Sequence, residues 1–186
     1  MSEKQIVNNL SKKIDKKTKR IMYILAFIIL GSILMHDADH LRQAFNWGYS
    51  IPFALLVLNL VVYLLPVVSI FLIKTERISS TLVTGFTGIF TTAGFLIIHL
   101  CGAFSGLWGV WNYSYFDLIK GVTYNGVFYK GVDVWSWIFL FEVPVLCLPC
   151  SAISFYEYFK VKKINKNKEN EIIKADEISE NKVNEN

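Results

Sequence analysis

The chain has 186 residues, of which 53% are apolar and 15% aromatic, and its mean hydropathy is +0.40. This composition is typical of an integral membrane protein, and one membrane domain would use nearly the whole length. The formal net charge of +4 lies mostly in the two terminal flanks. There it favours anionic lipid at the inner leaflet as a partner and argues against binding to nucleic acid.

Four apolar segments are long enough to cross a bilayer. A hydrocarbon core about 30 Å thick requires about 20 mostly apolar helical residues, because each residue adds about 1.5 Å. Residues 21–40, 51–73, 80–100 and 134–156 meet this requirement. The sequence therefore predicts an all-α membrane protein, with four transmembrane helices packed as an antiparallel bundle within a domain at 21–159.

Lysine and arginine predict the orientation of this bundle. Residues 1–20 hold seven of them, the turn after residue 73 holds two and the tail from residue 160 holds seven, against three in the other connections. Because basic flanks stay in the cytoplasm, we expect both termini to be cytoplasmic at the cell membrane and the loop at 102–133 to lie outside. The charged tail at 160–186 is expected to be disordered or loosely helical.

An unusual run of ionisable residues ends the first apolar segment, where residues 36–40 read His-Asp-Ala-Asp-His. Such groups rarely occur in a membrane helix without a function. Counting residues along the predicted spans places His99 on the third helix and Glu142 on the fourth in the same outer half of the bundle. The sequence therefore predicts a site that faces outward.

Imidazole and carboxylate donors together suit a divalent transition metal such as zinc, iron, copper or manganese. Two of the histidines are one helical turn apart, which places both rings over one face of the helix. In a metal-dependent membrane enzyme, Glu142 or Asp39 would act as the catalytic base toward a metal-bound water. The predicted metal ligands are His36, Asp37, His40, His99 and Glu142.

Several alternatives remain open at this stage. His36 or His40 with His99 would also provide the two axial ligands of a b-type haem. A transporter, or an accessory subunit with a membrane partner or a second copy of the chain, would use the cluster for protons or ions. Asp39 can instead be a solvated helix end paired with Arg42, and Glu142 a structural hydrogen-bonding group.

Helical phase indicates which faces point inward. On the third helix a stripe of mostly small residues leads to a histidine, and such stripes let membrane helices approach closely. This histidine is therefore expected to face the bundle. On the second helix, Asn59 and Tyr63 share one face. The stripe on the third helix comprises Gly85, Gly88, Thr92, Phe95 and His99.

The fourth segment contains Cys147-Leu148-Pro149-Cys150. This pair resembles the redox motif of four-helix membrane thiol oxidoreductases of the vitamin K epoxide reductase and DsbB types, and the resemblance implies a reactive disulfide. Those families carry a second cysteine pair in an outer loop, whereas this chain has only Cys101 besides. We therefore interpret the pair as buried packing cysteines.

The spacing of His36 and His40 also resembles one histidine box of the membrane di-iron hydroxylases and desaturases. Those enzymes bind two irons through several such boxes, and this chain has three histidines in all. The sequence thus favours a site for a single metal ion.

The outer loop at 102–133 is rich in aromatic residues, among them Trp108, Trp111 and Tyr115. Dense aromatics are typical of a membrane interface, so the loop is either a lid over the site or an interfacial anchor. Residues 122–124 and 127–129 flank Asn125-Gly126, the dipeptide preferred in tight hairpin turns. The sequence therefore predicts a small β-hairpin in this loop.

Overall fold

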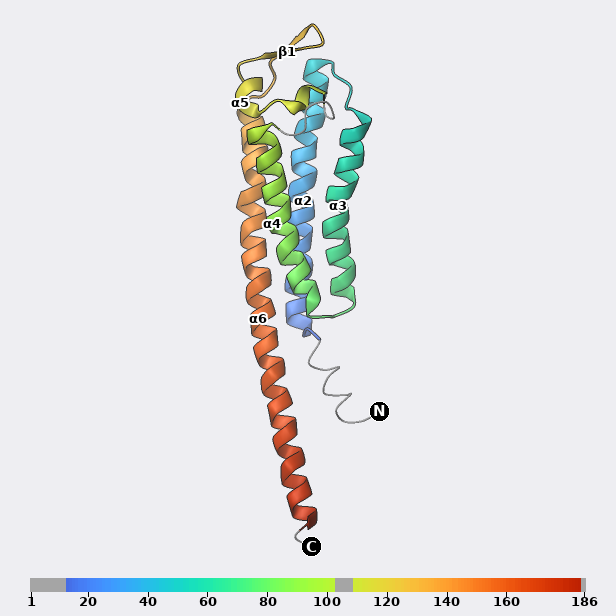
Figure 1. Cartoon of the computed structure of the whole chain (residues 1–186), viewed down its shortest axis with the longest axis vertical. Helices are drawn as coiled ribbons and strands as arrows, with labels where there is room; N and C mark the ends of the chain where they lie inside the picture. The colour runs from blue at the N-terminus through green and yellow to red at the C-terminus, as the bar shows by residue number, and fades with distance from the viewer. Residues whose placement is uncertain (1–12, 103–108, 185–186) are drawn as a thin grey trace.

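The computed structural model describes residues 13–102 and 109–184, with side chains as far as residue 174. Its four long helices are α2 (Lys16–Trp47), α3 (Phe53–Lys74), α4 (Ser79–Cys101) and α6 (Val134–Asn184). Each contains a segment long and apolar enough to cross a membrane. Figure 1 shows the four helices side by side, with α6 extending well beyond the end of the others.

The first helix is longer at both ends than the segment predicted from hydropathy. The side chain of Asp15 caps its start by accepting a hydrogen bond from the backbone N–H of Thr18 at 2.6 Å. Gly48, with φ at +61°, ends it in the left-handed conformation. Hydropathy missed the last two turns because they contain Arg42, Gln43 and Asn46.

The fourth helix differs from the expected boundary at residue 156. Of the two expectations for the tail, disordered or loosely helical, the structure shows a helix, because α6 continues without a break to Asn184. The residues beyond Pro149 include neither glycine nor proline and are rich in lysine and glutamate, which favour helix. The tail is therefore a helical extension of the last span.

Small residues on α4 let it pack closely against α6, as the stripe predicted. A Cβ atom on Gly88 would contact Ser151 and lie 2.7 Å from the carbonyl oxygen of Cys147, and one on Gly85 would lie 2.9 Å from the ring of Phe155. All five residues of the stripe are buried. Close packing between α4 and α6 thus fixes which face of α4 points inward.

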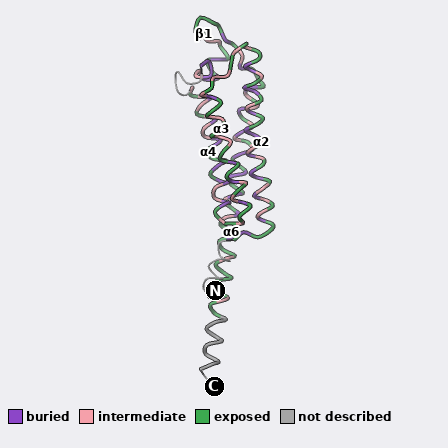
Figure 2. Tube along the Cα trace, turned by 90° about the vertical axis from the view of Figure 1, so that its right-hand side faces the viewer, coloured by how far each residue is buried: buried purple, intermediate pink, exposed green. Residues whose placement is uncertain are grey.

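By contrast, α3 is buried along a narrow face only. In the part of α3 with most membrane character, 17% of the residues are buried, against 44% for α4. Its outward side chains include Leu60 at 69% and Leu64 at 60% exposure. Figure 2 shows this pattern, with buried positions where helices meet and exposed positions along the outer faces. α3 therefore has the smallest buried share of the four helices that could span a membrane.

Short elements cover the end of the bundle beyond α4. They are the helical turns η1 (Gly109–Asn112) and α5 (Tyr115–Leu118) and the strands β1 (Val122–Tyr124) and β2 (Val127–Tyr129). The strands pair antiparallel, with Tyr124 opposite Val127, and Asn125 and Gly126 both have positive φ. The predicted hairpin is confirmed. Trp108 lies outside the described residues.

At the opposite end, polar contacts connect three segments. Lys19 forms an ion pair of 2.7 Å with Glu76 in the turn between α3 and α4, and the backbone N–H of Ile14 donates to the carbonyl oxygen of Glu76. The hydroxyl of Thr18 donates to Glu157 on α6 at 2.7 Å. These contacts hold the start of α2 against the α3–α4 turn and the continuation of α6.

Candidate metal centre

Three histidines from two helices converge in the interior. α2 contributes His36 and His40, one turn apart, and α4 contributes His99. The three Nε2 atoms form a nearly equilateral triangle, with sides of 3.2 Å (His36 to His40), 3.1 Å (His36 to His99) and 3.2 Å (His40 to His99). All three residues are buried, with exposures of 0%, 8% and 7%. The helix spacing predicted the first pair, and the glycine stripe correctly predicted that His99 faces the bundle.

Hydrogen bonds at the far side of two rings fix where their protons lie. The Nδ1–H of His36 donates to the carbonyl oxygen of Phe139 at 3.3 Å, and that of His99 donates to the carbonyl oxygen of Phe95 at 2.7 Å. A carbonyl oxygen only accepts, so the proton of each neutral ring is on Nδ1. The Nε2 lone pairs of His36 and His99 therefore face each other at 3.1 Å.

Facing lone pairs repel unless a cation lies between them. His40 can place one proton on its Nε2, because its Nδ1 has no hydrogen-bond partner within the described part of the chain. His40 can donate that proton to only one neighbouring nitrogen. The repulsion between the Nε2 lone pairs of His36 and His99 therefore remains. One metal ion satisfies all three nitrogens together, and the carbonyl oxygens at Nδ1 are the usual orienting partners of metal-bound histidines.

The size of the triangle fits a metal ion. The Nε2 atoms are 3.1–3.2 Å apart, so one ion with metal–nitrogen bonds of about 2.0–2.1 Å would be within reach of all three. Three histidines would leave a coordination position of a four-coordinate ion for another ligand. A cavity of about 90 Å³ borders His40 and His99, so there is space for a further ligand beside the histidines.

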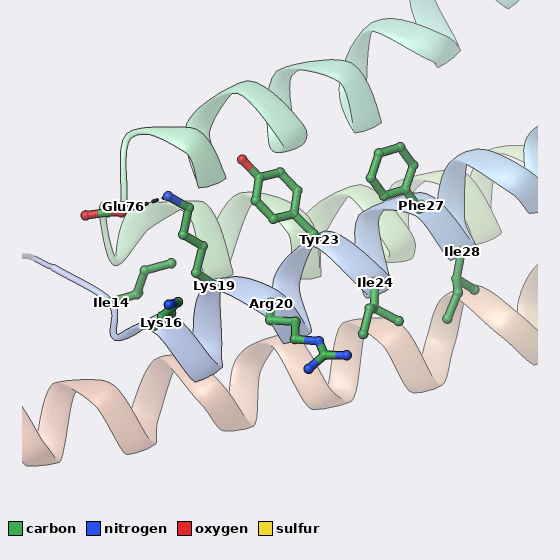
Figure 3. Close-up of a pocket in the computed structure, with 9 residues that line it drawn as sticks. All are labelled: Ile14, Lys16, Lys19, Arg20, Tyr23, Ile24, Phe27, Ile28 and Glu76. Carbon is green, nitrogen blue, oxygen red and sulfur yellow. Dashed lines mark hydrogen bonds and ion pairs between the residues drawn. The ribbon is translucent and has the colours of Figure 1, made fainter.

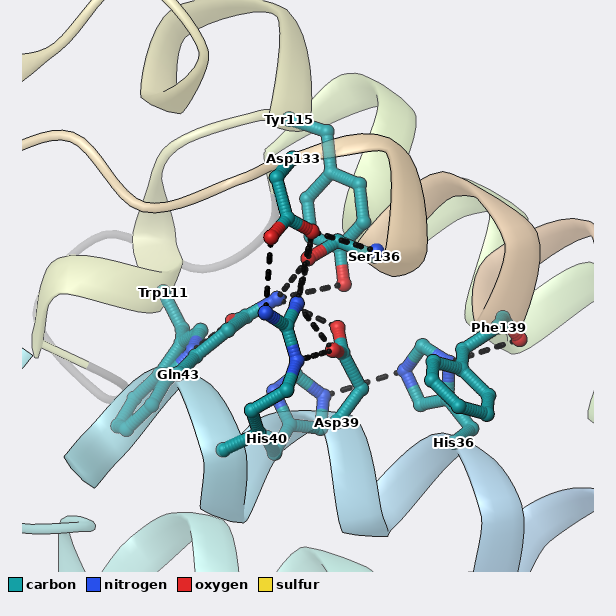
Figure 4. Close-up of polar contacts among 10 residues, drawn as sticks. His36, Asp39, His40, Gln43, Trp111, Tyr115, Asp133, Ser136 and Phe139 are labelled. Atoms are coloured by element: carbon teal, nitrogen blue, oxygen red, sulfur yellow. Dashed lines mark hydrogen bonds and ion pairs between the residues drawn. The ribbon is translucent and has the colours of Figure 1, made fainter. Parts of the chain in front are cut away.

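Asp39 lies beside the histidines but is fully engaged in other contacts. Its Oδ1 accepts from the Nε of Arg42 at 2.8 Å and its Oδ2 from the Nε2 of Gln43 at 2.7 Å (Figure 4). The sequence correctly paired Asp39 with Arg42. The expectation of a solvated helix end is wrong, because Asp39 is 1% exposed.

A polar network joins α2 to the segments that cover it. Arg42 donates to both carboxylate oxygens of Asp133 at 2.8 Å, and Arg42 and Gln43 both donate to the hydroxyl of Ser136. The indole N–H of Trp111 donates to Gln43 at 3.0 Å (Figure 4). The Arg42 guanidinium lowers the pKa of the Asp133 carboxyl. Sequence reasoning missed this network, although Gln43 shares the helical face of the two histidines.

Tyr115 also covers the histidines and was not predicted as a site residue. It is 1% exposed, and its ring meets that of His99 edge-on with 4.9 Å between the centroids. Burial raises the pKa of its phenol above the usual range. Dense aromatics in the outer loop were the signal for such a cover, but spacing alone did not indicate which ring turns inward.

The structure does not bring the other two predicted ligands to the triangle. Asp37 points toward α3, where its Oδ2 accepts from the hydroxyl of Tyr63 at 2.6 Å and from the amide of Asn59 at 3.3 Å. Both oxygens of Glu142 are covered and have no hydrogen-bond partner within the described part of the chain. Among the described residues, the donors close enough to share a metal are the three histidines.

The cysteine pair on α6 shows no disulfide. Cys147 and Cys150 are both buried and free, and the sulfur of Cys147 lies 3.1 Å from the hydroxyl oxygen of Ser32 on α2. Cys101, at the end of α4, is exposed. These positions agree with a packing role for the pair.

Comparisons of the chain with protein-family models, with curated proteins and with solved structures found no match. Its function is therefore argued from the geometry of the site and from the membrane character of the helices.

Proposed function

We propose that this chain is a multi-pass membrane protein in which His36, His40 and His99 hold one divalent transition metal. The supporting observation is the triangle of three Nε2 atoms, with sides of 3.1–3.2 Å. Two of these nitrogens, those of His36 and His99, carry a lone pair that can bind a metal. Three histidines with a free fourth position form the ligand set of catalytic zinc. We therefore infer a metal-dependent membrane enzyme, in which the bound ion supplies an activated water.

The arrangement in the membrane is part of this proposal. The helices form an antiparallel bundle with both termini in the cytoplasm, and the histidines lie toward the outer surface. The start of α2, the α3–α4 turn and the tail of α6 carry most of the lysine and arginine, which supports this orientation. In intact cells, a membrane-impermeant maleimide should label the exposed Cys101. Labelling only after lysis would reverse the orientation.

Metal analysis tests the proposed site directly. Protein purified in detergent should contain one transition metal per chain by mass spectrometry, and His36→Ala, His40→Ala and His99→Ala should each lose it. Loading with cobalt should produce visible absorption bands, because a low-symmetry tetrahedral site makes these transitions intense. Absence of metal from the wild-type protein, even after loading with zinc or cobalt, would overturn the proposal.

Two control variants separate loss of ligands from loss of fold. Glu142→Gln and Asp37→Asn change carboxylates that the structure places outside the triangle, so both should retain the metal. The helical circular dichroism of every variant should match that of the wild type. Metal loss in Glu142→Gln would return Glu142 to the ligand set and would contradict the three-histidine geometry.

The geometry favours a bare metal ion over haem. In a haem with two axial histidines, the nitrogens lie on opposite sides of the iron, about 4 Å apart with the macrocycle between them. Here the Nε2 atoms of His36 and His99 are 3.1 Å apart, with the Nε2 of His40 beside them. A Soret band in the purified protein would reverse this choice.

We also propose that anionic lipid binds at the cytoplasmic end of α2. A groove of about 890 Å³ there is lined by Lys16, Lys19 and Arg20 and, further along the helix, by Ile24 and Phe27 (Figure 3). Cations beside apolar side chains suit a phosphate head and its acyl chain. Co-purification of anionic phospholipid that Lys16→Ala with Arg20→Ala abolishes would support this partner, and unchanged lipid content would contradict it.

A further inference from the structure

A cavity and a groove lie next to each other along the contact between α2 and α3. The cavity of about 90 Å³ beside the histidines is enclosed by α2, α3 and α4, and a groove of about 460 Å³ runs along the outside of the α2–α3 contact. Asp37, His40, Leu55 and Asn59 line both hollows. The same four side chains therefore separate the groove on the outer side of the bundle from the cavity beside the three histidines.

The walls of the groove are hydrocarbon apart from a few polar groups. Leu34 and Leu41 line it from α2, and Leu56 and Leu60 from α3. These four side chains are at least 47% exposed, so the groove opens on the surface that would face the acyl chains of the bilayer. A molecule that binds here needs an apolar chain of its own.

The polar side chains that line the groove determine which head group can bind there. Within the described part of the chain, both hydrogen bonds to Asp37 go to Oδ2, from Tyr63 and Asn59, so Oδ1 remains available as an acceptor. A carboxylate with a free oxygen attracts a hydrogen-bond donor and repels an anionic head. A metal ion on His40, one turn along the same helix, repels a cationic head. A hydroxyl group meets both conditions, because it donates its proton to Asp37 and turns its oxygen toward the metal.

We propose that the α2–α3 groove binds a hydroxyl-bearing membrane lipid, with its chain between the two helices and its hydroxyl between Asp37 and the metal centre. This inference rests on the proposed metal site and identifies the class of its substrate. α3 forms one wall of the entrance, so the molecule arrives laterally from the bilayer.

Photolabelling tests the groove. The probe is a long-chain primary alcohol with a diazirine at the end of the chain, applied to the metal-loaded protein in detergent, and the labelled peptides are identified by mass spectrometry. Labels should map to the facing sides of α2 and α3. Unlabelled dodecanol should compete, whereas dodecane, dodecanoate and dodecylamine should not. Equal competition by dodecane, or by dodecylamine on protein with its full metal content, would overturn the hydroxyl assignment.

Asp37→Ala removes the acceptor and should weaken the binding of the alcohol about tenfold, the usual effect of losing a hydrogen bond to a charged group. Its metal content should stay at the wild-type level, because Asp37 lies outside the histidine triangle. Unchanged competition by dodecanol in this variant would overturn the role of Asp37.

A matched pair of glycine variants tests the connection to the metal. Gly94 lines the cavity and a Cβ atom on it would meet nothing within 4 Å, so Gly94→Leu would place its side chain in or beside the cavity. Gly31 on α2 is equally open but does not line the cavity, so Gly31→Leu is the control. Dodecanol should change the cobalt spectrum of the wild type and of Gly31→Leu but not that of Gly94→Leu. An equal response in all three would show that the alcohol does not reach the metal through this cavity.

Failure of the metal proposal and failure of the lipid proposal give different results. Protein without metal that is still labelled in the groove, with competition by dodecanol, would support the lipid site and overturn the metal centre. Protein with one metal per chain but no label on α2 or α3 would retain the metal centre and overturn the lipid site.

Discussion

The two sides of the bundle are built differently. On one side, α2, α4 and α6 meet through small residues and buried polar groups, among them Gly88 against α6, Ser32 beside Cys147 and Asp39 within its network. On the other side, α3 contributes few buried residues and leaves a cavity and a groove along its contact with α2. The closely packed side positions the three histidines, and the loosely packed side leaves the cavity that borders two of them.

This division has a physical basis. Lipid is as apolar as leucine, so membrane helices gain stability from close packing and from polar contacts between helices. Metal ligands must be held within fractions of an ångström, which requires the packed side. The proposed entry of a lipid would require helices that separate at low cost, and α3 has the smallest buried share of the four spans. Three matched comparisons test the division, and a fourth experiment tests an ion pair on the closely packed side.

The largest difference in the loss of unfolding free energy is expected between substitutions of Asp39 and of Asp37. Asp39→Ala leaves the buried partners of Asp39 without their acceptor and should lower the free energy of unfolding by about 3 kcal/mol. Asp37→Ala, on the α3 side and only partly buried, should cost about 1 kcal/mol. Unfolding by sodium dodecyl sulfate in mixed micelles, followed by circular dichroism, measures both. Equal losses of unfolding free energy would show that the two sides of the bundle are packed equally closely.

Leucine truncation gives the next contrast. Leu140 on α6 is fully buried, so Leu140→Ala leaves a cavity and should cost about 2–3 kcal/mol. Leu60 on α3 is 69% exposed, so Leu60→Ala should change the free energy of unfolding by less than about 0.5 kcal/mol. The same micelle titration applies. A loss above 1 kcal/mol for Leu60→Ala would indicate that a further partner packs on this face.

Glycine substitution on α4 compares its two faces within one helix. Gly88→Ala places a methyl group 2.7 Å from a carbonyl oxygen of α6, so the helices must move apart and we expect a loss of about 2 kcal/mol. Gly94→Ala points into open space and should be neutral or slightly stabilising, because alanine favours the helix. Thermal unfolding in detergent measures the pair, and a destabilised Gly94→Ala would mean that the cavity is smaller than the structure shows.

The smallest effect is expected at the ion pair between Arg42 and Asp133. The folded-state pKa of Asp133 is lowered, so its contribution to stability is present above the unfolded pKa of about 4 and is lost as the pH falls through the folded value. The side chain of Asp133 is 48% exposed, which limits the contribution to about 1 kcal/mol at neutral pH. The difference in stability between wild type and Asp133→Asn should therefore shrink on acidification below pH about 4. A difference that is independent of pH would exclude this ion pair as its source.

Local patterns in the sequence determined much of the architecture. Runs of apolar residues gave the four helices, Asn125-Gly126 gave the hairpin, and the small residues at 85 and 88 gave the inward face of α4. Each of these depends on neighbouring residues and on a fixed helical or strand period. Whether the tail is helical or disordered stayed open in the sequence, because hydropathy indicates where lipid begins and not where a helix ends.

Only the tertiary structure decided which polar residues meet. Counting residues gives depth in the membrane, and the small-residue stripe gave the inward direction of His99, but no such pattern gave the direction of Glu142. The direction in which each helix faces depends on packing between helices, which turned His99 into the triangle and left Glu142 outside it. Asp37 and Asp39 are about 200° apart around α2, so one faces α3 and the other faces α6 and its cover. The sequence by itself determined which histidines and carboxylates lie at that depth. The rotation of the packed helices decided which of these side chains form the site.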